Sequence, residues 1–277
     1  MNCFIFPGQP LAFGSTNPDD PDFAAIARLA MDHASLNIHS MEWEGAKSTE
    51  NVKLQVYGVA MSLYQARKLR SRGVHPDLAA EHSMGIYPAL AVCGFLSEAE
   101  VLELTFRAGS CMAKIGEREE FALGCVIGSP LETLLPIIEG HGVYLANHNT
   151  SRHFLFSGVK SKMEDAMAEA LAAGAFSAKL FPCDAPLHTP LMAELERPLR
   201  EIFGGFRYRE PGIRLMNHID QDYLTAMEVE DFLFAELCEP VFWERTYRAL
   251  RSAGNHKLWE VGVGDSLKKY NRWIDYE

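Results

Sequence analysis

Short apolar runs alternate with longer amphipathic stretches in the first part of the chain. Residues 3–6 form an apolar run closed by a Pro-Gly pair, which predicts a buried strand that enters a loop. Residues 51–72 place apolar side chains at helical spacing, and residues 76–80 predict a second short strand. Further helices are predicted at 23–33, 88–96 and 97–114. Such alternation is typical of a parallel sheet covered by helices.

The pattern changes after residue 117. Strands are predicted at 121–127, 143–146, 153–156 and 178–181, with helices at 130–140 and 162–173. This β-α-β-β-α-β order is typical of a ferredoxin-like unit. Later helices (191–203, 223–237, 242–253) and strands (213–216, 257–263) should complete the first sheet. We therefore predict an α/β fold in which residues 1–117 and 185–277 form a large parallel-sheet domain and residues 118–184 an inserted ferredoxin-like subdomain.

Length and composition limit the class of protein. A chain of 277 residues suits one large domain with a small insertion. The net charge of −11 disfavours binding to nucleic acid or to an anionic membrane. No apolar run approaches the roughly 18 residues of a membrane span, and no secretory signal is visible. Six scattered cysteines suggest neither a disulfide framework nor a zinc site. We expect a cytoplasmic protein with no metal.

A serine lies at the boundary between the second predicted strand and the helix after it. In the pentapeptide Glu81-His82-Ser83-Met84-Gly85, a tight strand-to-helix turn would expose the Ser83 hydroxyl and direct backbone N–H groups at the atom it attacks. The strict form of this motif has glycine two residues before the serine, where this chain has Glu81. Taken alone, the pentapeptide is therefore a weak signal for a nucleophile.

A serine nucleophile needs a base within hydrogen-bond reach, and neutral histidine usually supplies it. His82 directly precedes the serine, so its side chain should point away, and we interpret it as structural. His188 lies between Pro186 and Pro190, which restrict a loop just before a predicted helix. Such a loop suits a base held in one orientation, although composition alone favours a surface or capping histidine.

Four separated segments together resemble the malonyl-CoA:acyl-carrier-protein transacylases and the acyltransferase domains of polyketide synthases. They are residues 6–9 (Phe-Pro-Gly-Gln), 81–85 (Glu-His-Ser-Met-Gly), 106–109 (Phe-Arg-Ala-Gly) and 187–192 (Leu-His-Thr-Pro-Leu-Met). Their order and spacing agree with the family, and further counterparts extend the likeness over nearly the whole chain. The resemblance implies an α/β-hydrolase-like large domain with a ferredoxin-like small subdomain.

The resemblance also implies roles for individual residues. Ser83 would be the nucleophile and His188 its general base, oriented by a backbone carbonyl, so that Asp184 is not required. The backbone N–H groups of Gln9 and Met84 would form the oxyanion hole. Further counterparts in substrate binding are Gln55, Asn149 and Leu187. The implied reaction transfers malonyl from malonyl-CoA through an acyl-serine to the phosphopantetheine thiol of an acyl carrier protein, with no tightly bound cofactor.

By the same resemblance, Arg107 would lie at the bottom of the acyl pocket. A guanidinium can receive the malonyl carboxylate through two parallel hydrogen bonds. An acetyl group would leave a buried arginine unpaired, at a cost of about 3–5 kcal/mol, which corresponds to a preference of more than roughly a hundredfold. Without the resemblance, an arginine after Phe106 on a helix would more often be a surface residue.

Glu81, Ile86 and Pro10 depart from the family's pattern. A carboxylate at position 81 is expected to raise the pKa of the base and to disfavour an anionic substrate. The departures therefore concern rate and acyl preference more than reaction type. Two alternatives stay open: an esterase or thioesterase whose base is His218 or His256, and a noncatalytic subunit that binds a carrier protein.

Overall fold

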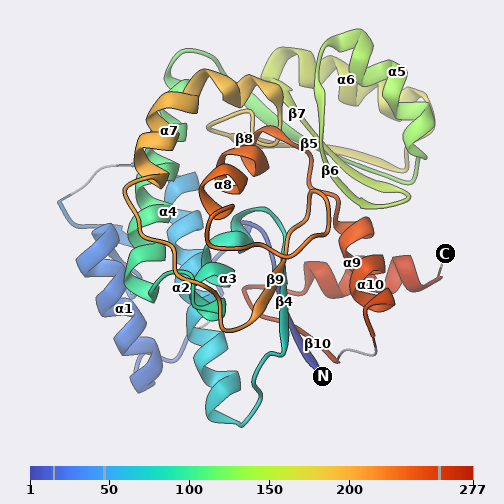
Figure 1. The fold of residues 1–277 in the computed structure, drawn as a ribbon. Helices are drawn as coiled ribbons and strands as arrows, with labels where there is room; N and C mark the ends of the chain where they lie inside the picture. The colour runs from blue at the N-terminus through green and yellow to red at the C-terminus, as the bar shows by residue number, and fades with distance from the viewer. Residues whose placement is uncertain (15, 46–47, 255–256, 277) are drawn as a thin grey trace.

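A parallel sheet of four strands organises most of the chain (Figure 1). The computed structural model describes residues 1–14, 16–45, 48–254 and 257–276. In spatial order the strands are β10 (Lys257–Glu260), β1 (Asn2–Phe6), β4 (Leu78–Glu81) and β9 (Arg214–Met216), and each neighbouring pair runs parallel. Strands separated by long stretches of sequence thus lie side by side, as predicted.

Helices cover both faces of this sheet. They are α1 (Pro21–Ala34), α2 (Glu50–Ser71), α3 (Ile86–Cys93), α4 (Glu98–Ala113), α7 (Glu196–Phe203), α8 (Val229–Cys238), α9 (Trp243–Ser252) and α10 (Ser266–Tyr276). Side chains of β1 alternate between two hydrophobic clusters: Phe4 and Phe6 pack with the cluster of α1 to α4, whereas Cys3 and Ile5 pack with that of α9 and α10. Because both faces are buried, β1 is apolar throughout its buried length.

Side chains at the helix starts explain where several helices begin. Thr49 caps α2 by accepting a hydrogen bond from the backbone N–H of Val52 at 3.3 Å. The predicted capping box of α4 is present, with Ser97 and Glu100 bonded reciprocally. These caps satisfy N–H groups that the first helical turn leaves without an intrahelical acceptor.

The second sheet is antiparallel and belongs to the inserted segment (Figure 1). Its strands are β5 (Phe121–Ile127), β6 (Tyr144–Thr150), β7 (His153–Val159) and β8 (Ser177–Cys183), and its helices are α5 (Leu131–His141) and α6 (Lys160–Ala172). The spatial order β6-β7-β5-β8 is that of a ferredoxin-like unit, and a separate hydrophobic cluster fills it. The α/β fold with a ferredoxin-like subdomain is confirmed, while its residue limits, 118–184, stay a prediction.

Several elements differ from the predicted ones. The helix expected from residue 191 begins as a 3-10 helix over Pro190–Leu195 before α7. The helix expected from residue 223 starts only at Val229, because Tyr223 forms an antiparallel bridge with Met216. The two-residue strands β2 (Leu36–Asn37) and β3 (Glu42–Trp43) are too short to show a period, and α10 was not predicted.

Two further findings concern the cysteines and the apolar character of the helices. All six cysteines are free thiols, and Cys3, Cys93 and Cys111 are buried. Among the described residues, no helix combines the length and the apolar character that crossing a membrane requires.

The turn after β4 lies against the end of β1. The Phe6 carbonyl accepts a hydrogen bond from the backbone N–H of His82 at 3.0 Å. A Cβ added to Gly85 would lie 2.3 Å from that same carbonyl oxygen. Gly85 is therefore required for the close approach of the turn to β1.

We expect Gly85→Ala to lower the free energy of unfolding by about 3 kcal/mol, because the new methyl group overlaps backbone atoms that cannot move independently. Gly140→Ala is the matched control, since a Cβ there meets nothing within 4 Å; it should leave the value unchanged or raise it by up to about 1 kcal/mol. Urea denaturation measures both. Equal midpoints for the two variants would contradict the packing argument.

Candidate active site

Ser83 lies at the strand-to-helix turn that its sequence context predicted. β4 ends at Glu81, His82 is extended, and a 3-10 helix over Ser83–Gly85 leads directly into α3. Ser83 has φ +56°, in the left-handed region that non-glycine residues rarely adopt. The hydrogen bond and the close contact of this turn with Phe6 hold the serine in a conformation that is unfavourable by itself.

The imidazole of His188 lies directly beside the serine. Ser83 Oγ is 2.7 Å from His188 Nε2, although the two residues are 105 positions apart. The other ring nitrogen, Nδ1, donates to the backbone carbonyl of Glu236 at 2.7 Å. This second bond places the proton on Nδ1 and leaves Nε2 free to accept the hydroxyl proton. The pair is thus assembled for general-base activation of Ser83.

The loop that carries His188 is held from both sides. The backbone N–H of His188 donates to the carbonyl of Leu237 at 2.8 Å, so α8 fixes the backbone as well as the ring. Thr189 Oγ1 donates to the carbonyl of Pro186 at 2.6 Å. His188 also has a positive φ, +60°. Both members of the pair therefore occupy strained backbone positions that the surrounding hydrogen bonds maintain.

Burial keeps the base neutral. His188 is 4% exposed, and this desolvation, with the neighbouring His218 as the next cause, lowers its pKa to about 3. The expectation that Glu81 would raise the pKa of the base is therefore wrong. Glu81 instead bonds His218: its Oε1 lies 2.7 Å from His218 Nδ1 and accepts from the His218 backbone N–H at 3.1 Å.

Glu81, His218 and Glu236 form a buried polar group behind the base. Burial raises the pKa of both carboxyl groups well above the usual range and lowers that of His218 to about 3. His218 Nε2 and Glu236 Oε2 have no hydrogen-bond partner among the described residues. Glu236 Oε2 is 3.7 Å from His188 Nδ1, too far for a hydrogen bond, so the carbonyl orients the base.

Two members of this group, together with His188, are potential metal ligands. One atom each from His188, His218 and Glu236 lies within 4.8 Å of the others. Both ring nitrogens of His188 already have protein partners, however. A cation coordinated by His188 would displace the bond to Ser83 or the bond to the Glu236 carbonyl, so metal binding there and general-base activity exclude each other.

Gln9 lies on the loop after β1, and Met84 lies in the turn after β4. The two segments pack against each other. A Cβ on Gly8 would lie 3.1 Å from His82 Nδ1, which locates this loop against the turn. Pro10 and Met84 both pack on Gly58 of α2. The side chain of Gln9 donates to Asn51 Oδ1 at 3.1 Å. The loop that carries Gln9 and the turn that carries Ser83 and Met84 thus lie against each other, while an oxyanion hole formed by their backbone N–H groups stays a prediction.

The other predicted substrate-binding residues lie at different depths. Gln55 is buried, and its Oε1 would be 2.7 Å from a Cβ on Gly109 of α4. Asn149 is also buried, and its Oδ1 accepts a hydrogen bond from His82 Nε2 at 2.9 Å, which gives His82 the structural role predicted for it. Leu187 is half-buried and immediately precedes the base.

Arg107 does not lie at the bottom of a pocket. Its side chain is 41% exposed, pairs with Glu103 one helical turn earlier (Nη1 to Oε1, 3.1 Å) and lies over the ring of Phe206. The inward positions of α4 include the fully buried Leu104 and Ala108 instead. The prediction of a buried arginine is wrong because position 107 lies on the polar stripe of the helix.

A cavity of about 700 Å³ lies between the large domain and the inserted segment. Residues of the large domain, such as Thr49 and Ser110, line one side, and residues of the inserted segment, such as Lys160 and Leu180, line the other. Ser83 and His188 are not part of its lining. The hydrogen-bonded pair, and not the cavity, therefore locates the chemistry.

Comparisons with known proteins agree with this geometry. The sequence profile of a family described as "Acyl transferase domain" matches residues 20–261. The malonyl CoA-acyl carrier protein transacylase of Bacillus subtilis is 25% identical over 286 residues, which cover 98% of this chain and 90% of that protein. The protein of the same name from Escherichia coli is 28% identical, over 96% of this chain and 90% of its own.

Solved structures share the fold. The malonyl CoA-acyl carrier protein transacylase of Coxiella burnetii superposes with a TM-score of 0.88 at 23% identity, covering 99% of this chain and 91% of that one. A malonyl-transacylase solved in complex with a type II PKS acyl-carrier protein gives a TM-score of 0.86 at 24% identity, covering 98% of this chain and 92% of that one.

We expect the His188 imidazole to stay neutral from pH 8 down to about pH 5, because burial disfavours the imidazolium. The measurement is an NMR titration of its Cε1 proton, assigned by the loss of that signal in His188→Gln. Since its pKa is lowered from 6.5 to about 3, protonation should begin only well below the ordinary range. A midpoint at or above 6.5 would show that the ring is hydrated and not buried.

Proposed function

The chain belongs to the acyl transferase domain family, and on that premise we propose that it transfers a malonyl group from malonyl-CoA to the phosphopantetheine thiol of an acyl carrier protein. The observation that carries the chemistry is the 2.7 Å contact between Ser83 Oγ and His188 Nε2. The other ring nitrogen of His188, Nδ1, is held by the backbone carbonyl of Glu236. The names of the relatives, malonyl CoA-acyl carrier protein transacylases, support the donor and the acceptor.

In the first half-reaction, Ser83 Oγ attacks the thioester carbonyl carbon while its proton passes to His188 Nε2. Negative charge then develops on the carbonyl oxygen, where the backbone N–H groups of Gln9 and Met84 would stabilise it. The carbon–sulfur bond breaks, coenzyme A leaves as the thiol after taking the proton from Nε2, and an ester remains on Ser83.

The second half-reaction reverses these steps with another thiol. The phosphopantetheine thiol of the carrier protein gives its proton to His188 Nε2 and attacks the ester carbonyl. The ester bond breaks, Ser83 recovers the proton, and the acyl group leaves on the carrier protein. Donor and acceptor present the same pantetheine arm, so one site can serve both in turn, with ping-pong kinetics and no tightly bound cofactor.

The anchored Nδ1 has a defined part in both steps. When His188 holds the additional proton, the ring is an imidazolium whose Nδ1–H points at the Glu236 carbonyl oxygen, 2.7 Å away. That dipole stabilises the transient positive charge and prevents the ring from rotating between steps. A backbone carbonyl therefore does here what a carboxylate does in many serine enzymes.

The esterase alternative needs a different base. His218 bonds Glu81, and its ring centre is 6.3 Å from that of His188, so it is not the partner of Ser83. His256 lies outside the described residues. The preassembled pair of Ser83 and His188 also gives no support to a noncatalytic subunit. We further propose a cytoplasmic location, which the six free thiols support.

We expect Ser83→Ala to abolish covalent labelling by radioactive malonyl-CoA, because the Ser83 hydroxyl is the one that bonds His188 Nε2 among the residues that the structure describes. Ser161→Ala, at an exposed position of α6, should keep full labelling and serves as the control. Labelling is measured as radioactivity retained after denaturation. Stoichiometric labelling of Ser83→Ala would refute the assignment of the nucleophile.

His188→Ala should lower kcat/KM for transfer by about 10²–10⁴-fold, since the hydroxyl then has no general base. The matched control is His33→Ala, at an exposed position near the end of α1, which should retain the rate of the parent protein. Steady-state transfer to a carrier protein measures both. Near-parent activity of His188→Ala would remove the base from the mechanism.

A further inference from the structure

The lysine and arginine side chains that the structure describes lie away from the protein interior, and this bears on which acyl group the site prefers. Within the described ranges, every lysine and arginine keeps part of its side chain in water. Half-buried ones are already bonded within the protein: Arg67 bonds Glu98, Lys68 bonds Asp20, and Arg70 donates to the backbone carbonyl of Val92. Arg107, the residue expected to receive a carboxylate, pairs with Glu103 at the surface.

The buried ionisable groups near Ser83 supply no positive charge. Glu81 and His218 form a pair whose net charge is zero whichever of the two holds the proton. Glu236 is neutral or negative, and it lies 3.7 Å from the base. His188 is neutral before each transfer, because burial disfavours its charged form. A second carboxylate brought beside these groups would find no counter-charge among them.

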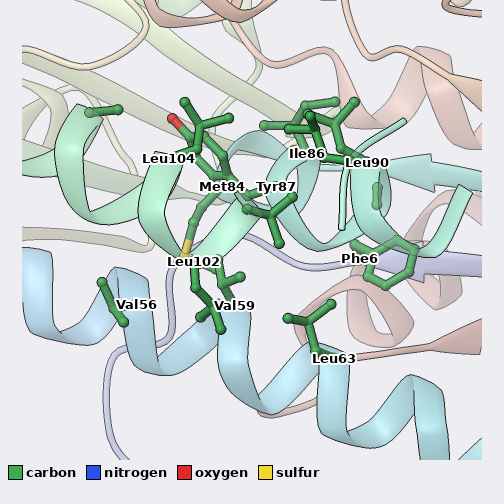
Figure 2. Close-up of a cluster of buried hydrophobic side chains, with 14 of the residues drawn as sticks. Phe6, Val56, Val59, Leu63, Met84, Ile86, Tyr87, Leu90, Leu102 and Leu104 are labelled. Carbon is green, nitrogen blue, oxygen red and sulfur yellow. The ribbon is translucent and has the colours of Figure 1, made fainter. Parts of the chain in front are cut away.

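The side chains packed around Met84 are mostly apolar and include no cation; the Tyr87 hydroxyl is a buried polar atom among them. Met84, which follows Ser83, points between α2 and α4 and packs in a cluster with Val56, Val59 and Leu102 (Figure 2). Tyr87 and Leu104 extend the same cluster (Figure 2). An ionised carboxylate placed against this cluster would lose its water without gaining a charged partner, a penalty that an alkyl group does not incur.

We infer that the site does not recognise the terminal carboxylate of an acyl group and transfers uncharged short acyl groups, such as acetyl and butyryl, at least as well as malonyl. The inference rests on the proposed acyl transfer through Ser83 and concerns only the donor. A malonyl carboxylate can still react if it stays hydrated outside the apolar cluster, but it contributes no affinity.

The direct test is a competition between donors on the full chain. Malonyl-CoA is mixed with an equal concentration of acetyl-CoA or butyryl-CoA, and intact-protein mass spectrometry identifies the group on Ser83 at early times. We expect the ratio of kcat/KM for malonyl to that for acetyl to be at or below about 1. A ratio reproducibly above 1 would overturn the inference.

The two proposals fail in different ways in this experiment. If malonyl-serine forms and the uncharged groups do not compete, acyl transfer stands and the inference about selectivity falls. If none of the donors produces an ester on Ser83, the proposed function itself fails. An ester formed preferentially from acetyl-CoA or butyryl-CoA supports acyl transfer through Ser83 and the inference, and it makes malonyl a secondary donor.

Arg107→Ala tests the same point without changing the donor. Arg118→Ala is its matched control, because Arg118 is likewise an exposed arginine paired with a glutamate, Glu194. Both variants should retain the parent protein's malonyl-to-acetyl ratio within about twofold. A fall in malonyl transfer for Arg107→Ala alone, with acetyl transfer preserved, would show that Arg107 reaches the acyl group and would contradict the inference.

Discussion

The hydrogen bond between Ser83 and His188 is the interaction on which the rest of the site depends. It joins two residues 105 positions apart, and each has a positive φ that its own side chain disfavours. The Phe6 carbonyl at the end of β1 fixes the serine turn, and the carbonyls at the end of α8 fix the histidine. The parallel sheet and α8 therefore supply the stability that maintains the strained pair.

Glu81 stands where the motif has a glycine, and its side chain is fully buried. The carboxyl group bonds both the ring and the backbone of His218 and does not face His188. Its effect on the base is therefore indirect: it fixes His218, whose ring lies against that of His188. Together with Glu236 it surrounds the base with acidic and neutral groups only. The same arrangement that keeps the base neutral thus leaves a carboxylated substrate without a counter-charge.

Arg107 shows that a sequence motif on a helix must be read together with the helical periodicity, which determines the direction of each side chain. The motif places an arginine on α4, but helical spacing puts Glu103 and Arg107 on one outward stripe and Leu104 and Ala108 on the inward one. That periodicity was present in the sequence and would have predicted a surface residue. A motif reports which residue types occur, whereas periodicity reports which way they point.

The sequence by itself determined most of the longer helices and strands, the inserted ferredoxin-like order and the serine turn, because these depend on local periodicity, capping and glycine at Gly85. The residues alone favoured a surface or capping histidine at position 188, and only the family resemblance assigned His188 as the base. Only the tertiary structure decided that the Glu236 carbonyl orients this ring, that Asn149 bonds His82, and that Glu81 bonds His218. The physical reason is that these contacts join segments distant in sequence, whose approach depends on how the packed layers meet and not on any local pattern.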